Sequence, residues 1–230
     1  MAVSVDTVYQ RVLALANKEQ RGYITPQEFN LFANQAQMDI FEQYFYDINQ
    51  FGRVPGNDTG YSDMRNYLEE KINVFELQAT VSQSSGYYDA GSSIVDLYKI
   101  GSISVNGIPC QQVNANRLDI ILSSSLTKPT TSHPIYVLKQ NKVYIYPTSI
   151  SADITVNYVK KPDEAEWSGY NIGGAIQYNE GFSTQFELHP SEEPDLVIKV
   201  LQLAGITLKD PALYQATNLE DNKNTQQEKQ

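Results

Sequence analysis

The sequence predicts an α+β protein in which N-terminal antiparallel helices and a C-terminal helix carry an inserted antiparallel β module. Three observations predict this class. Apolar residues recur at helical spacing through the first 49 residues, a period of two dominates from about residue 74 to residue 159, and helical spacing returns after residue 191. With 230 residues, 41% of them apolar, the chain can bury a sizeable core.

The first two helices are expected at residues 5–17 and 26–49. The second begins at the clearest local signal in the sequence, because Thr25 and Glu28 form a capping box and Pro26 occupies the first helical position. Its apolar face consists of Phe29, Phe32, Ala33, Ala36, Ile40, Tyr44 and Ile48.

Shorter elements follow. Residues 50–61 have the composition of a loop, residues 62–71 fit a short helix, and residues 74–81 alternate as a strand. Residues 117–125 fit a short helix and a strand equally well.

The β module is marked most clearly by Asn106-Gly107, which lies between two apolar runs. Both positions tolerate φ > 0, so this dipeptide predicts a hairpin that joins residues 97–105 to residues 108–113. A second hairpin is expected to turn at Gln140-Asn141. The remaining strands are expected at residues 135–138, 143–146 and 154–159.

These elements define the expected organisation. Residues 1–72 form a helical region, and residues 73–189 form a β-rich module that includes a long loop, with at most one short strand, at residues 163–183. Residues 190–211 form a helix that packs on the N-terminal helices. Residues 212–230 form a polar extension that is expected to be disordered in isolation.

The formal net charge is −10, and the sequence pI is about 4.7. Wrapping nucleic acid requires clustered Lys and Arg, so sequence-specific DNA binding is not expected. A single cysteine, Cys110, excludes an internal disulfide. We expect no signal peptide and no membrane-spanning helix, and therefore folding in a reducing cytoplasm.

The residues that could carry chemistry are few and scattered. His133 and His189 each precede a proline and lack metal-ligand spacing, so we interpret both as turn residues. Cys110 fits a small buried side chain, and Glu192-Glu193 fits a helix start. No phosphate-binding or nucleophile-elbow motif is present. We therefore expect no enzyme, no metal and no cofactor.

The 16 tyrosines are the most unusual feature of the composition. Tyrosine suits protein interfaces, where one end of the side chain is apolar and the other is wet, although simple β propensity explains many of these positions equally well. The candidate interface residues are Phe32, Tyr44, Tyr144, Tyr146, Tyr158 and Tyr214.

The order of these segments resembles the head-to-tail connector or adaptor proteins of tailed bacteriophages, including the tail tubular A type. The similarity covers most of the chain: an N-terminal helical pair, a β module with Asn106-Gly107, and a helix after Leu188-His-Pro190. Its most specific part is the stretch from residue 134 to residue 162, with Tyr144-Ile-Tyr-Pro147 at its centre.

The resemblance implies a virion structural protein that forms a ring, usually of twelve copies, in the neck or tail. Such a ring assembles in the host bacterial cytoplasm, binds the portal protein on one side and a tail nozzle or next ring on the other, and lines the channel through which packaged DNA passes during ejection. In some members of this family a C-terminal extension docks on the portal, and by position residues 209–230 would be that extension here. The hairpin at Asn106-Gly107 and the loop at residues 163–183 are expected to face the channel or a neighbouring ring.

Other functions stay open on the sequence alone. The protein could be another tail-completion component, or a carbohydrate- or receptor-binding virion module built on the tyrosine-rich β region. A hydrolase of unrecognised type requires a role for His133 or His189.

Overall fold

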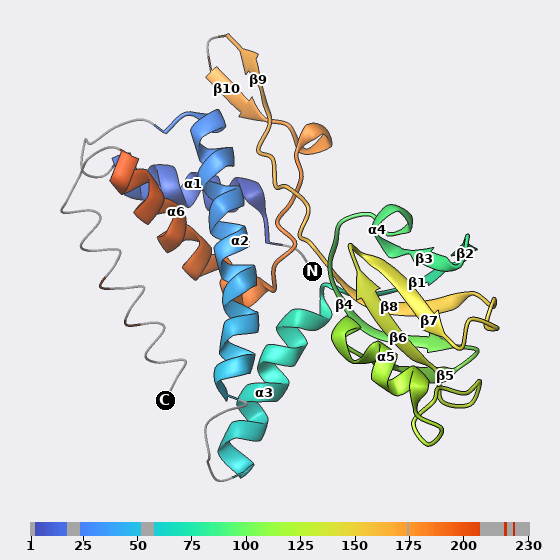
Figure 1. Cartoon of the computed structure of the whole chain (residues 1–230). Helices are drawn as coiled ribbons and strands as arrows, with labels where there is room; N and C mark the ends of the chain where they lie inside the picture. The colour runs from blue at the N-terminus through green and yellow to red at the C-terminus, as the bar shows by residue number, and fades with distance from the viewer. Residues whose placement is uncertain are drawn as a thin grey trace. The chain divides into compact units, whose positions relative to one another are not determined.

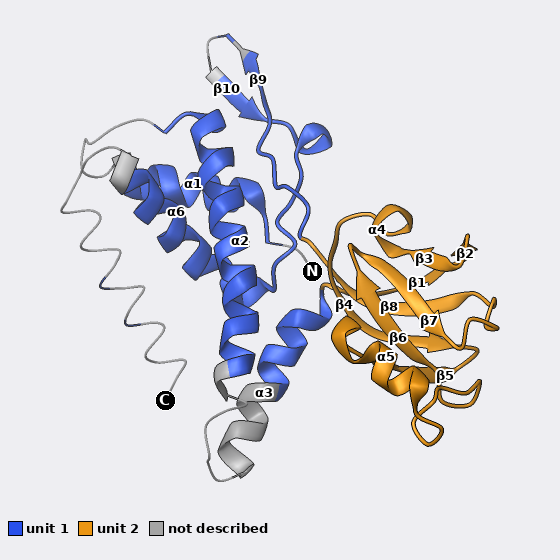
Figure 2. Cartoon of the chain, in the orientation of Figure 1, with its two compact units in different colours: residues 1–74, 162–230 blue, residues 75–161 orange. Residues whose placement is uncertain are grey.

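A computed structural model describes residues 3–17, 24–51, 58–173 and 175–207, together with the single residues 219 and 223. The chain divides into two compact units (Figure 2). Unit 1 comprises residues 1–74 and 162–230, and unit 2 comprises residues 75–161. The predicted α+β class is confirmed, since the described residues form helices and a large curled mixed sheet.

Unit 1 is built on four helices: α1 Val5–Asn17, α2 Pro26–Phe51, α3 Asp58–Asn73 and α6 Glu193–Thr207. Helix α6 packs against both α1 and α2, and α3 packs against α2 (Figure 1). Helix α3 is longer than the sequence analysis predicted. A short 3-10 turn, η2 Pro190–Glu192, leads into α6, which continues past Gly205.

The start of α2 has the predicted capping geometry. The Thr25 backbone N–H donates to Glu28 Oε2 at 3.0 Å, and the Glu28 backbone N–H donates to Thr25 Oγ1 at 3.3 Å. Ile24 and Phe29 are buried on either side of the cap, as a hydrophobic staple requires. Two otherwise unsatisfied backbone donors are therefore paired where the helix begins.

An extended segment, residues 163–167, lies along α2 and is held there by amide side chains. Asn34 Nδ2 donates to the Ala165 carbonyl at 2.9 Å, and the Ala165 N–H donates to Asn34 Oδ1 at 2.8 Å. Asn30 makes the same pair of bonds to Trp167, and Gln37 Nε2 donates to the Asp163 carbonyl. Asn30 and Asn34 are four residues apart on the helix, which corresponds to a rise of about 6.0 Å. Their partners Trp167 and Ala165 are two residues apart on an extended chain, which spans about 6.6 Å, so the two spacings match.

The rest of the predicted loop at 163–183 is not irregular. It contains a two-stranded hairpin, β9 Gly169–Ile172 and β10 Ala175–Tyr178, and a 3-10 turn, η1 Glu180–Phe182. At Gly169 a Cβ would lie 2.6 Å from Ile176 Cγ2 and 2.8 Å from the Trp167 ring, so a residue without a side chain is needed there. The hairpin projects from unit 1 beyond the start of α2 (Figure 1).

Unit 2 contains one sheet in the order β1-β8-β4-β5-β6-β7-β3-β2. The strands are β1 Glu76–Val81, β2 Gln83–Ser84, β3 Tyr87–Asp89, β4 Leu97–Val105, β5 Ile108–Gln112, β6 Ile135–Lys139, β7 Lys142–Tyr146 and β8 Ile154–Lys160. The pair β5–β6 is parallel, so the predicted antiparallel module is instead a mixed sheet. A connection through a helix, α5 Ala115–Ser123, makes this parallel pairing possible.

The sheet curls round on itself. Strands β1 and β2 stand at opposite ends of the strand order, yet only Ser82 separates them along the chain. The two edges must therefore approach each other where β1 ends and β2 begins.

The predicted turns of unit 2 are confirmed. Asn106 and Gly107 have φ of 48° and 79°, and Gln140 and Asn141 have φ of 50° and 59°. The ambiguous segment 117–125 is helical up to Ser123, where α5 ends. Three elements of unit 2 were not predicted from the sequence: β2, β3 and a short helix, α4 Ala90–Ser93.

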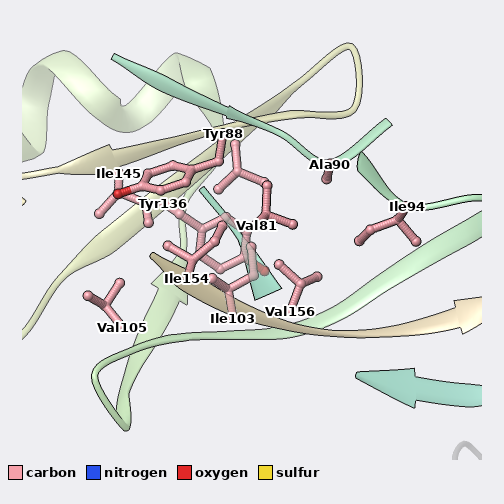
Figure 3. Close-up of a cluster of buried hydrophobic side chains, with 11 residues drawn as sticks. Val81, Tyr88, Ala90, Ile94, Ile103, Val105, Tyr136, Ile145, Ile154 and Val156 are labelled. Carbon is pink, nitrogen blue, oxygen red and sulfur yellow. The ribbon is translucent and has the colours of Figure 1, made fainter. Parts of the chain in front are cut away.

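Unit 2 has two hydrophobic clusters. The larger fills the inside of the curled sheet (Figure 3) and is formed by Val81, Tyr88, Ala90, Ile94, Ile103, Val105, Tyr136, Val143, Ile145, Ile154 and Val156. The smaller lies on the opposite face of β6, where Leu118 of α5 packs on Ile135 and Val137. Strand β6 is therefore covered on both faces over its first three residues.

The structure places residues 162–189 differently from the sequence analysis. The sequence predicts that they belong to the β-rich module, but they belong to unit 1. The physical reason is the amide pairing to α2 and the bridge between Val3 and Phe186, which hold this stretch on the helices. Most of residues 208–230 lie outside the described residues.

Candidate functional site

The candidate interface residues of α2 have different environments. Tyr44 is only 3% exposed and belongs to the interior of unit 1, with Lys71 Nζ 5.5 Å from the centre of its aromatic ring. Phe32 is half-buried. Tyr46, two residues beyond Tyr44, is 64% exposed and is the tyrosine that α2 presents to solvent.

The candidates in unit 2 do not form one surface. Tyr146 packs against the smaller hydrophobic cluster beside α5, and Tyr158 packs against the larger one. Tyr144 lies on the outer face of β7. Tyr214 falls outside the described residues.

Around Tyr144, two lysines and two tyrosines form a compact surface, here called the lysine–tyrosine surface: Tyr87, Lys139, Lys142 and Tyr144. The two aromatic ring centroids are 5.9 Å apart. Lys142 Nζ lies 4.6 Å from the centroid of Tyr87, and Lys139 Nζ lies 5.6 Å from that of Tyr144. Cations held over aromatic faces are partly ordered while their charge stays near solvent.

A second surface runs along the outer face of α2. Five exposed residues follow one another at spacings of three or four, so they share one face of the helix. This acidic stripe consists of Leu31, Gln35, Asp39, Glu42 and Tyr46, and it is about 22 Å long at 1.5 Å per residue. Desolvation raises the pKa of Asp39, although the charge of Lys199 acts in the opposite direction.

A third surface is the hairpin β9–β10 with η1. Phe182 is 77% exposed, and Tyr170 and Ile176 are also exposed. The hairpin contacts the preceding segment through Tyr178 and Trp167, whose ring centroids are 6.0 Å apart and whose planes are tilted by 35°. A two-stranded hairpin is marginally stable by itself, and this one exposes large apolar side chains.

A shallow groove of about 470 Å³ lies on the outer face of β1, β8 and β4. Along it runs a row of hydrogen-bonded side chains: Gln78 Nε2 donates to Asn157 Oδ1 at 3.0 Å, and Asn157 Nδ2 donates to Ser102 Oγ at 2.8 Å. All three side chains are exposed, so the groove is a polar surface that could bind a hydroxyl-rich ligand.

The residues closest to a catalytic arrangement surround Ser191. Its hydroxyl oxygen lies 2.8 Å from His189 Nδ1, accepts a hydrogen bond from the Tyr67 hydroxyl, and donates one to Glu192 Oε1. His189 Nδ1 also accepts the Ser191 backbone N–H, which makes His189 the N-cap of η2. Glu192 in turn forms a buried salt bridge with Lys71. This network holds the start of α6 against α3.

The other candidate groups for chemistry stand apart. Cys110 is half-buried on β5, and burial raises the pKa of its thiol. His133 closes a tight turn with Thr130. Among the described residues, no group of three or more His, Cys, Asp or Glu side chains is placed to hold a metal, and no helix is long and apolar enough to cross a membrane.

The charge is divided unevenly between the two units. Residues 75–161 contain seven Lys or Arg and five Asp or Glu, whereas the rest of the chain contains ten and 22. Unit 1 therefore carries all of the excess negative charge, and unit 2 is slightly positive.

Comparison with known proteins assigns no family. No protein-family model matches this chain, and a search of curated proteins returned no match.

Proposed function

We propose that this chain is a structural subunit of the head-to-tail connector of a tailed bacteriophage, which assembles as a ring between the portal protein and the tail and surrounds the DNA channel. The proposal continues the resemblance found in the sequence. The resemblance implies that the N-terminal helices carry an inserted β module. The division of the chain supports this arrangement, because residues 75–161 interrupt the sequence of the helical unit 1.

One observation carries the proposal: the β9–β10 hairpin and η1 present Tyr170, Ile176 and Phe182 to solvent. Exposed apolar side chains on a projecting two-stranded hairpin are best explained by a protein partner that covers them. In a connector, that partner is the portal or the next component of the tail.

The proposal is tested by mixing the full chain with the portal protein and measuring their co-elution. The double variant Ile176→Ser/Phe182→Ser should lose the complex while its circular dichroism stays unchanged. The matched control is Leu126→Ser, which removes an exposed apolar side chain from unit 2. Undiminished portal binding by the hairpin variant, or no complex with the unaltered chain, contradicts the proposal.

A second candidate is a saccharide-binding virion module, which the groove along Gln78, Asn157 and Ser102 favours. Paired amide groups can both donate to and accept from sugar hydroxyls. This function predicts glycan-array binding that Asn157→Ala abolishes and that Gln112→Ala, an exposed change on β5, leaves intact. Absence of glycan binding by the full chain rejects this candidate.

A further inference from the structure

We infer that the lysine–tyrosine surface of unit 2 binds the acidic stripe of α2 in a second copy of this chain, so that copies join head to tail. This inference rests on the proposed function, because it names the contact through which the copies of the ring meet. The two surfaces come from different parts of the chain, as the heterologous interface of a cyclic assembly requires.

The lysine–tyrosine surface has a net positive charge, because its two lysines face the single carboxylate of Asp89. Lys139 and Lys142 are paired directly across the end of the β6–β7 hairpin, and like charges in such a pair repel each other. Asp89 is the cross-strand partner of Lys142 on its other side, but its carboxylate also accepts hydrogen bonds from Ser92. An anionic partner that lies over both lysines relieves this repulsion.

The acidic stripe of α2 offers the complementary chemistry. Glu42 is exposed and follows Asp39 by three residues, so two carboxylates lie side by side on the helix. Tyr46 and Leu31 add exposed apolar area near its two ends. Tyr87 and Tyr144 are half-buried, and their remaining exposed faces can pack against Tyr46, which lies about 6 Å along the helix from Glu42.

The division of charge between the units favours this pairing over others. Two copies of unit 1 repel each other because each has 12 more acidic than basic residues. Contact between unit 2 of one copy and unit 1 of the next brings opposite charges together. The contact should therefore weaken as ionic strength rises.

Duplex DNA is the competing anionic partner. Two lysines with an adjacent aspartate supply few phosphate contacts, whereas DNA-binding surfaces commonly make six to ten. A protein carboxylate surface with neighbouring apolar groups fits the lysine–tyrosine surface better.

The experiment uses sedimentation velocity on the full chain and two charge-reversal variants. Lys139→Glu/Lys142→Glu disables the lysine–tyrosine surface, and Glu42→Lys disables the stripe. Each variant alone should lose self-association by at least about tenfold in affinity, because like charges then face each other. Lys128→Glu on unit 2 and Glu70→Lys on α3 are exposed control changes that should have no such effect.

Mixing the two variants gives the sharpest result. Each variant retains the surface that the other has lost, so mixing the two variants should restore the association that neither shows alone. If both variants still self-associate, the proposed contact is wrong, but the proposal that the chain forms a ring is not contradicted. The proposed contact is also wrong if Lys139→Glu/Lys142→Glu stops binding duplex DNA that the unaltered chain binds, while its self-association is unchanged. A chain that stays monomeric with and without the portal overturns both this contact and the proposed function.

Discussion

Lys71 Nζ lies 2.5 Å from Glu192 Oε1, and the two side chains are only 4% and 6% exposed. Lys71 is in the last turn of α3, and Glu192 ends the turn that leads into α6. Lys71 also lies 4.5 Å from the centre of the Tyr67 aromatic ring. The pair therefore joins two segments of unit 1 that are 121 positions apart in the sequence, at the point where the chain leaves for unit 2.

Removing one member of this pair should strongly destabilise unit 1. Lys71→Met or Glu192→Gln breaks this buried ion pair by removing one of its two charges, which typically costs about 3–5 kcal/mol. The double variant Lys71→Met/Glu192→Leu should recover most of the loss, because neither charge remains. Urea denaturation measures all three, and Arg11→Gln at the more exposed Arg11–Glu193 pair should change stability by less than about 1 kcal/mol. Single variants as stable as the unaltered chain contradict this account.

The amide pairing along α2 should contribute measurably to stability. Asn34→Leu leaves the N–H and C=O of buried Ala165 without their partner, with an expected loss of about 1–3 kcal/mol. Asn49→Ala, at an exposed position of the same helix, should be nearly neutral. Amide hydrogen exchange at Ala165 gives an independent readout, which should accelerate in Asn34→Leu. Unchanged exchange there would show that Asn34 does not hold the segment.

The capping box predicts a pH dependence in acid. Hydrogen bonds from the backbone N–H and the hydroxyl of Thr25 lower the pKa of Glu28 below its usual value of 4.5. The folded chain therefore favours the carboxylate form of Glu28. The stabilisation that this carboxylate gives is fully present above the pKa of Glu28 in the unfolded chain, and it is lost as the pH falls through the lower pKa of the folded chain. Thr25→Ala should cost about 1 kcal/mol at pH 7 and Thr25→Ser much less. Equal thermal midpoints for the three chains at pH 7 exclude this role for the cap.

Cys110 should react slowly with thiol reagents. Burial raises the pKa of this thiol, so less thiolate is present at pH 8 than in an unfolded chain. The labelling rate of the native protein should be well below the rate in 6 M guanidinium and should rise with pH. A native rate equal to the denatured rate shows an accessible, ordinary thiol.

The sequence was most informative where structure is set by neighbouring residues. The capping box at Thr25 and the turns at Asn106-Gly107 and Gln140-Asn141 depend on local backbone preference, and all three were predicted. The β9–β10 hairpin was missed although its signal was present, since Gly173-Gly174 separates two short alternating runs.

The rest depended on contacts between distant residues. Asn30 and Asn34 pair with residues more than 130 positions away, and no local pattern indicates the partner. That pairing also explains why residues 163–167 belong to unit 1. Tyr44 was a different case, because its place on the apolar face of the predicted helix already indicated burial and made it a poor interface candidate.

The two surfaces of the proposed head-to-tail contact were only partly visible in the sequence. Tyr144 was a candidate, but Tyr87 joins it only because β3 pairs with β7. The acidic stripe of α2 follows from helical spacing, whereas its exposure depends on which faces α3 and α6 cover.

The central claim, that this chain acts by assembling with copies of itself and with other virion components, is tested most directly by electron microscopy of the full chain mixed with its portal protein. The account predicts closed rings of the chain, of about twelve copies, seated on one face of the portal. Portal particles that remain bare beside monomers of this chain contradict it.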